Sequence, residues 1–114
     1  MANHENIVNP KAHVQVKKHY PASGAATVTL AADAENFHAI SRIDWSYAST
    51  PTNGNLTVVA GTTTLLDIDI TSGGHGYYDL KFPDLLHNDY TKNEEVVITL
   101  ASASVRGKLT VRHI

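Results

Sequence analysis

The chain has no cysteine among its 114 residues, so disulfides, thiol nucleophiles and thiolate zinc sites are excluded. No run approaches the roughly 18 apolar residues that a membrane-spanning helix needs. The start, MANHENIVNP, has no apolar segment typical of a secretory signal, and we expect a protein assembled in a cytoplasm. Charged residues make up only 18% and the formal net charge is −2, which gives no reason to expect nucleic acid as a partner.

The length predicts one folded domain. Hydrophobic residues make up 42% of the chain, which is typical of a protein with a packed core. Residues 1–10 show no periodic pattern and end at Pro10, which predicts a loose N-terminal arm. We therefore expect a single domain over residues 11–114, preceded by this arm.

Apolar and polar residues alternate over most of the chain, whereas helical spacing is rare. Successive side chains of a strand point to opposite faces, so this alternation predicts half-buried β-strands. Seven segments show it: 14–16, 26–30, 37–47, 56–58, 66–70, 96–100 and 109–111. Within the third, the alternation slips at Ser41 and Arg42, which predicts a β-bulge or a change of sheet. A helix over 31–40 would adjoin Thr-rich strand sequence, so at most one helical turn is expected there.

Turn-forming residues lie between these segments, at 21–24, 50–55, 60–63 and 72–76. Asn53-Gly54 predicts a hairpin that joins the strand of Trp45 to the strand of Leu56. Together these patterns predict an all-β fold: an antiparallel β-sandwich, jelly-roll-like, with about eight short strands.

Metal-binding and paired-carboxylate sites are weakly indicated. No two of the seven histidines stand three to five residues apart, and no His-x-His pair occurs, so we expect surface histidines and no metal or other cofactor. Asp67 and Asp69 share one strand face and could hold Ca²⁺ or act as an acid/base pair. No further ligands or cleft are evident, and the simpler interpretation is a hydrated face or contacts with Lys and Arg on neighbouring strands.

Catalytic motifs are also missing. His75 and Asp79 could be combined with a serine into a triad, but there is no G-x-S-x-G turn, and SGGHG is typical of a flexible loop. A phosphate-binding Gly-rich loop followed by Lys-Ser/Thr does not occur either. We therefore expect a protein that is not an enzyme.

The aromatic residues indicate both core and surface. Trp45 keeps the same phase as Ile43, so we expect it to pack in the core rather than to bind a ligand. Tyr77 and Tyr78 are adjacent and cannot both point inward from a strand. One of them is therefore expected at a functional surface, such as a contact between subunits.

Both terminal strands are basic. The cationic residues there are Lys11, Lys17, Lys18, Arg106, Lys108 and Arg112. If the two strands are neighbours, they form a positive stripe suited to an acidic partner or to an identical subunit. An edge protected by lysines is the equally favoured alternative.

Three stretches resemble a family of small all-β proteins encoded among the structural genes of tailed bacteriophages and prophages. They are ISRIDWSYASTPTNGNLTVV, TTLLDIDITSGGHGYYDLKF and VVITLASASVRGKLTV. The resemblance covers residues 40–111, departs from the family over 74–90, and leaves the first 35 residues unmatched. The family is similar in size and style to capsid decoration, or cement, proteins.

The resemblance implies a homotrimeric decoration protein on the outer surface of an assembled phage head. Its partners would be the major capsid protein and its own copies, with no nucleic acid and no membrane. On this hypothesis the capsid contacts are assigned to Asn6, Ile7, Val8, Lys11, Lys17 and Lys18, and the subunit contacts to Tyr77 and Tyr78. The alternatives are a tail, neck or baseplate component of the virion, and a carbohydrate-binding β-sandwich module that uses Trp45 or the tyrosines.

Overall fold

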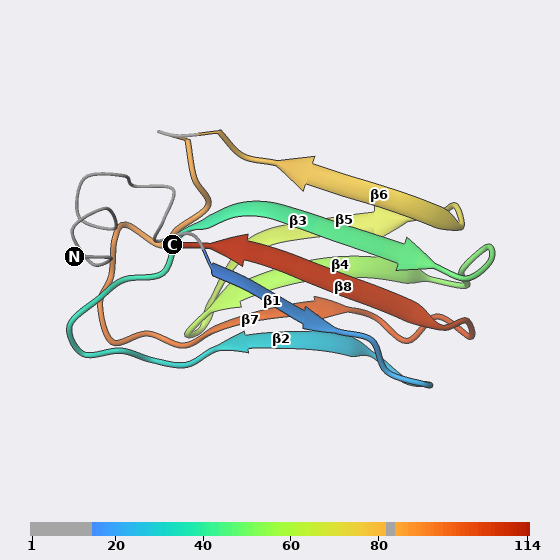
Figure 1. The fold of residues 1–114 in the computed structure, drawn as a ribbon, viewed down its shortest axis with the longest axis horizontal. Coiled ribbons are helices and arrows are strands. Elements are labelled where there is room, and N and C mark those ends of the chain that lie inside the picture. Colours follow the sequence, from blue (N-terminus) through green and yellow to red (C-terminus); the bar gives the residue numbers. More distant parts are fainter. Residues whose placement is uncertain (1–14, 82–83) are drawn as a thin grey trace, which may run out of the picture.

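The computed structural model describes residues 15–81 and 84–114, which form two four-stranded sheets packed face to face (Figure 1). Sheet A has the strand order β1 (Gln15–His19), β8 (Gly107–His113), β3 (Ile40–Tyr47) and β6 (Gly74–Asp79). Sheet B has the order β2 (Ala26–Leu30), β7 (Val96–Leu100), β4 (Gly54–Ala60) and β5 (Thr63–Ile70). The predicted arm, residues 1–10, lies outside the described residues.

The two strand orders are those of a jelly roll. Within each sheet all neighbours are antiparallel, and every connection between consecutive strands except β4–β5 crosses from one sheet to the other (Figure 1). The predicted all-β, jelly-roll-like sandwich of about eight strands is therefore confirmed. The described residues contain no helix that could span a membrane.

The predicted hairpin at Asn53-Gly54 is wrong. The strand of Trp45 is β3 in sheet A, and the strand of Leu56 is β4 in sheet B, so residues 48–53 cross between sheets. The predicted turn conformation of Asn53 is nevertheless correct, because its φ is 55°, in the left-handed region that Asn tolerates. Gly54 then starts β4 so close to Ile70 that an added Cβ would lie 2.5 Å from the Ile70 carbonyl oxygen. The hairpin partner of β4 is β5, and a turn signal alone does not specify which strand pairs next.

The slip in alternation at Ser41 is a β-bulge. The pairing of β3 with β8 shifts register between Ile40 and Arg42, as predicted, and the bulge returns Ile43 to the inner face. The helix considered for 31–40 does not form. Instead, the Asp33 carboxylate accepts hydrogen bonds from the Glu35 backbone N–H at 2.9 Å and from Asn36 Nδ2 at 3.0 Å, which fixes a turn.

The core lies between the sheets and is built mainly from the alternating inward-facing residues of the strands. Its largest fully buried members are Tyr47, Leu30, Ile40, Ile43, Leu56, Ile98, Leu100, Leu109, Val58 and Val111. The Tyr47 hydroxyl donates a 2.7 Å hydrogen bond to the Ala101 carbonyl, so one side chain of sheet A is bonded to the end of β7 in sheet B. Burial raises the pKa of Tyr47 above its ordinary value, because the phenolate would lose hydration there.

Trp45 packs against this core, as predicted from its phase with Ile43. In the pairing of β3 with β6 it stands opposite Gly76. A Cβ at Gly76 would lie 2.5 Å from the indole ring, so the absence of a side chain there makes room for Trp45. The only tryptophan therefore completes the inner side of sheet A near its β6 edge.

Candidate functional site on the outer face of sheet A

The outer face of sheet A carries charged and aromatic side chains from all four strands. Outward positions alternate with the core positions on β3, which places Arg42, Asp44 and Ser46 on this surface. The residues paired opposite them on β6 are Asp79, Tyr77 and His75, in that order. On β8 the outward residues are Lys108, Thr110 and Arg112, and Lys18 of β1 stands opposite Thr110. We call this surface the sheet A face.

Asp44 is the centre of a polar network on the sheet A face. Arg42 donates two hydrogen bonds to its carboxylate, from Nε to Oδ2 at 2.9 Å and from Nη2 to Oδ1 at 3.1 Å. His75 Nε2 lies 3.0 Å from Oδ1, and Arg42 Nη1 lies 3.8 Å from Asp79 Oδ2. Two-point contact fixes the guanidinium plane, so the network orients Arg42 as well as neutralising Asp44.

The network shifts the ionisation of its members. Partial burial acts to raise the pKa of Asp44, but the hydrogen bonds from Arg42 and His75 outweigh it, and the pKa lies below its ordinary value. The hydrogen bond to Asp44 also raises the pKa of Arg42. Asp44 is therefore ionised at neutral pH and serves as a fixed acceptor.

Tyr77 is held on this network. The Arg42 guanidinium carbon lies 4.4 Å from the centre of the Tyr77 ring, and the ring of His75 stacks at 6.1 Å with an interplanar angle of 22°. The side chain of Tyr77 nevertheless remains 58% exposed. An exposed aromatic ring with a fixed orientation is a group that can contact a ligand at low entropic cost.

Tyr20 lies on the opposite side of the sheet A face, just after β1. Its hydroxyl is hydrogen-bonded with Thr110 Oγ1 at 2.9 Å, and the side chain is 53% exposed. The ammonium groups of Lys18 and Lys108 lie 5.7 and 5.8 Å from the centre of its ring. Beside Tyr20 is a shallow depression of about 280 Å³, lined by Tyr20, Asp44, Trp45, Ser46, His75, Lys108 and Thr110.

The sequence patterns predicted the surface position of only some of these residues. Tyr77 is on the outer face, as one of the two tyrosines had to be, while Tyr78 pairs with Ile43 on the inward side and is 38% exposed at the edge. The terminal strands β1 and β8 are neighbours, so Lys108 and Arg112 form part of the predicted positive stripe on the sheet A face. Lys18 belongs to it, whereas Lys17 points to the other side.

The remaining predicted capsid contacts lie outside the described residues. They are Asn6, Ile7, Val8 and Lys11. Arg42, Asp44 and Tyr20 were not predicted as site residues. The alternation around Trp45 does put Arg42 and Asp44 on the outer face, but only the strand order brings β6 and β1 beside them.

The other sites considered from the sequence do not assemble. Asp67 and Asp69 are on sheet B, where Asn55 Nδ2 donates to Asp67 Oδ1 at 2.7 Å, a contact with an amide rather than with a Lys or Arg. His75 is bonded to Asp44 and not to Asp79, which contacts Arg42 instead. Within residues 15–81 and 84–114 no group of three His, Asp or Glu side chains is arranged to hold a metal ion.

No protein-family model and no curated protein sequence matches the chain. Among solved structures, a carbohydrate-binding module CBM36 in complex with calcium and xylotriose is similar, with 17% identity, a TM-score of 0.43, and coverage of 84% of this chain and 75% of that chain. A non-crystalline cellulose specific carbohydrate-binding module, CBM28, is 14% identical, with a TM-score of 0.46 and coverage of 84% of this chain and 69% of that chain. The protein PirA is 12% identical, with a TM-score of 0.46 and coverage of 90% of this chain and 94% of that chain. These similarities do not assign a ligand to this chain.

Proposed function

We propose that this protein is a non-catalytic binding module whose ligand is a short glycan held on the sheet A face. The observation that carries the proposal is the pair of exposed tyrosines on the sheet A face: Tyr20 lines the depression, and Tyr77 stacks on His75, which lines it as well. Sugars have apolar ring faces and hydroxyl groups around their edges. A surface that combines aromatic rings with hydrogen-bonding groups matches both features.

The hydrogen-bonding groups in the depression suit hydroxyls. Each sugar hydroxyl can donate and accept, and the depression offers the donor Lys108, the mixed groups Ser46 and Thr110, and the acceptor Asp44. Asp44 Oδ1 accepts hydrogen bonds from Arg42 Nη2 and His75 Nε2, whereas Oδ2 accepts only one, from Arg42 Nε. Oδ2 therefore keeps a lone pair for a ligand. The carboxylate therefore mainly positions Arg42 and His75, while its second oxygen can accept one ligand hydroxyl.

The spacing of the strands also fits a short glycan. Tyr77, Asp44 and Thr110 stand opposite one another on the adjacent strands β6, β3 and β8. Neighbouring strands are about 4.8 Å apart, so Tyr77 and Thr110 are separated by roughly 10 Å. The Tyr20 hydroxyl is bonded to Thr110, which leaves a span suited to one or two sugar rings between the tyrosines.

The proposal is tested by titrating the full chain with soluble oligosaccharides of glucose, xylose, mannose and N-acetylglucosamine, using calorimetry. At least one should bind, and Tyr77→Ala and Tyr20→Ala should each weaken it by about tenfold, the equivalent of about 1.4 kcal/mol. The matched control is Tyr90→Ala, since Tyr90 is also exposed but lies on the segment between β6 and β7. No binding by any sugar, or an equal loss with Tyr90→Ala, would refute the proposal.

A second candidate is a structural protein of a phage virion, which the resemblance over residues 40–111 favours. The sheet A face supports this too, because Tyr and Arg are enriched in protein interfaces and the face is mainly basic. Its cationic side chains are Lys18, Arg42, Lys108 and Arg112, against the carboxylates of Asp44 and Asp79. In this role the face would contact an acidic surface of the shell protein, with Tyr77 between subunits of a trimer.

Mass spectrometry of purified virions tests the second candidate. Copies comparable in number to the major shell protein are expected of a decoration protein, and a small fraction of that number would place the chain in the neck, tail or baseplate. Its absence from the particles would contradict both virion roles and leave the glycan proposal standing alone.

A further inference from the structure

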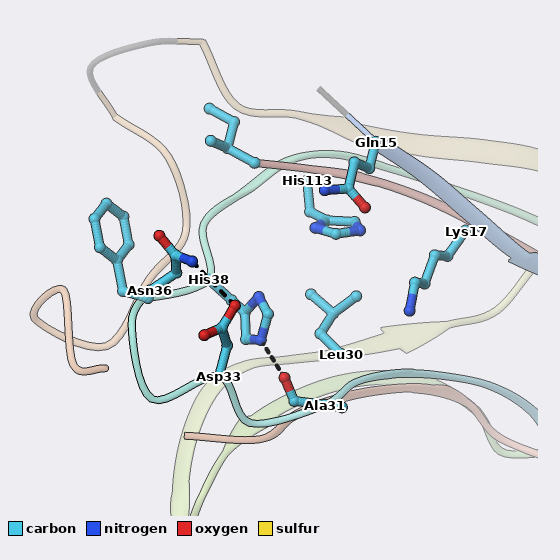
Figure 2. A pocket seen from close by; sticks show the side chains of 10 residues that line it. Gln15, Lys17, Leu30, Ala31, Asp33, Asn36, His38 and His113 are labelled. Carbon is cyan, nitrogen blue, oxygen red and sulfur yellow. Dashed lines mark hydrogen bonds between the residues drawn. The ribbon is translucent and has the colours of Figure 1, made fainter. Parts of the chain in front are cut away.

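A second cavity lies beside the β2–β3 connection, near the start of β1 and the end of β8 (Figure 2). It has a volume of about 700 Å³ and is bounded by β1, by the end of β8, and by the segment that connects β2 to β3. Its lining residues are Gln15, Lys17, Leu30, Ala31, Asp33, Asn36, Phe37, His38, His113 and Ile114. None of these belongs to the depression on the sheet A face.

His113 is the unusual group in this cavity. Its side chain is buried, with 4% of the residue exposed, and it points into the cavity (Figure 2). Neither ring nitrogen has a hydrogen-bond partner among the described residues. A buried polar group without a partner is unfavourable because it has lost its hydrogen bonds to water, so a hydrogen-bonding ligand at this position would stabilise it.

The charges around His113 indicate what kind of ligand fits. Lys17 on β1 and His38 on the β2–β3 segment are both close enough for their positive charges to disfavour a protonated His113. Burial is the largest cause and, together with these charges, outweighs an opposing effect of the Ile114 backbone, so the pKa of His113 lies below its ordinary value. The ring is therefore neutral at neutral pH, with Lys17 beside it as a cation.

The one carboxylate side chain among the lining residues, that of Asp33, is already engaged. Both oxygens of Asp33 accept hydrogen bonds within its own turn, from Glu35 and Asn36. His38 Nε2 is likewise hydrogen-bonded to the Ala31 carbonyl at 2.7 Å. Figure 2 shows Asp33 turned toward Asn36, with Lys17 and His113 on the other side of the cavity. The groups left for a ligand are thus mainly donors.

We propose that this cavity binds a small organic anion whose carboxylate or phosphate oxygens accept hydrogen bonds from Lys17 and His113. The apolar part of the ligand packs against Leu30, Phe37 and Ile114, which line the same space. Charge-assisted hydrogen bonds of this kind are among the strongest available to a small ligand. Binding of the anion offsets the repulsion from Lys17 and His38 and favours proton uptake by His113.

The test uses the full chain and three ligands with the same apolar body: benzoate, phenyl phosphate and neutral benzyl alcohol. Binding is measured by NMR titration, with the His113 ring followed across pH. One or both anions should bind, benzyl alcohol should not, and the pKa of His113 should rise in the complex. Affinity should consequently fall as pH increases through that pKa. The two anions separate a carboxylate from a phosphate preference.

Two variants on β1 make the test specific. Lys17→Gln should weaken anion binding by about tenfold, as expected for the loss of one charge-assisted hydrogen bond. Lys18→Gln changes the neighbouring lysine, which belongs to the sheet A face, and should leave binding unchanged. Both side chains are exposed, so neither variant threatens the fold. Equal binding of benzyl alcohol, equal effects of the two variants, or no binding by either anion would overturn the proposal.

Discussion

The outer faces of the two sheets are built on the same alternation but carry different chemistry. One cross-strand row of sheet A contains Tyr77, Asp44, Thr110 and Lys18. The corresponding row of sheet B contains Thr27, Thr99, Thr57 and Asp67. Short β-branched side chains favour strand structure and pack against their neighbours, so the sheet B face is explained by the fold alone. The sheet A face carries an ion-pair network and exposed aromatic rings that the fold does not require, which is why we assign function to it.

The largest expected effect comes from breaking the contact beneath the sheet A face. Gly76→Ala places a Cβ 2.5 Å from the Trp45 ring, so the indole must move or β6 must shift. We expect a loss of about 1–3 kcal/mol in the free energy of unfolding, measured with urea, together with a shift in Trp45 fluorescence. Thr99→Ala on the sheet B face is the control and should cost less than about 1 kcal/mol. Unchanged stability and fluorescence in Gly76→Ala would show that the close contact is not required.

The next largest effect on stability concerns the hydrogen bond by which Tyr47 of sheet A contacts the Ala101 carbonyl at the end of β7 in sheet B. Tyr47→Phe removes the hydroxyl that donates to the Ala101 carbonyl at 2.7 Å, and that partly buried carbonyl loses its side-chain partner. The expected loss is about 1–2 kcal/mol in the free energy of unfolding. Tyr78→Phe, at the exposed edge of β6, should be close to neutral by the same urea measurement. Equal losses in the two variants would contradict this role for Tyr47.

The stability of the protein as a function of pH tests whether His113, in the cavity at the end of the sandwich, is buried as a neutral ring. The pKa of His113 is lowered in the folded protein from its ordinary 6.5, so the unfolded chain binds a proton first as pH falls. Its contribution to stability is complete above about pH 6.5 and is lost progressively below it. Lys17 and His38, the charged groups that act on the ring, are both retained in the variant. The fall in stability between pH 7 and 5 should therefore be smaller in His113→Phe than in the parent chain, and identical slopes would refute the assignment.

The smallest effect on folding, and the sharpest comparison, comes from two carboxylates on opposite outer faces. Asp44→Asn removes the acceptor that orients Arg42 and His75, whereas Asp67→Asn affects a single contact with Asn55. Because both residues are near the surface, unfolding temperatures should change little in either variant. The NMR signals of the Tyr77 ring should move only in Asp44→Asn. Movement in both, or in neither, would show that the network does not position Tyr77.

The fold was largely predictable because its main determinant is local. The alternation of residues such as Leu56, Val58 and Ala60 sets both strand type and face, and even the slip at Ser41 was visible as a phase change. The pairing was not predictable, because β4 pairs with β5 and β7, while β3 pairs with β6 and β8. Turn residues such as Asn53 fix a local backbone conformation and carry no information about the sheet to which the next strand belongs.

The candidate site depended on that missing information. Alternation alone places Asp44 on an outer face, but its contact with His75 requires β6 beside β3, and the approach of Tyr20 to Thr110 requires β1 beside β8. The segments involved are separated by about 30 and 90 residues in the chain. Alternation with a period of two does not indicate which distant strands become neighbours. The sequence therefore indicated one surface tyrosine and a basic stripe but not the depression on the sheet A face.

The central claim is that ligands bind the sheet A face and not the sheet B face. The most direct measurement is an amide chemical-shift map recorded while the chain is titrated with the tightest-binding oligosaccharide of the panel. We predict that the largest changes fall on Asp44, Ser46, His75, Tyr77 and Thr110, while Thr27, Thr57 and Thr99 do not move. Changes centred on sheet B, or no saturable change with any oligosaccharide, would contradict the account.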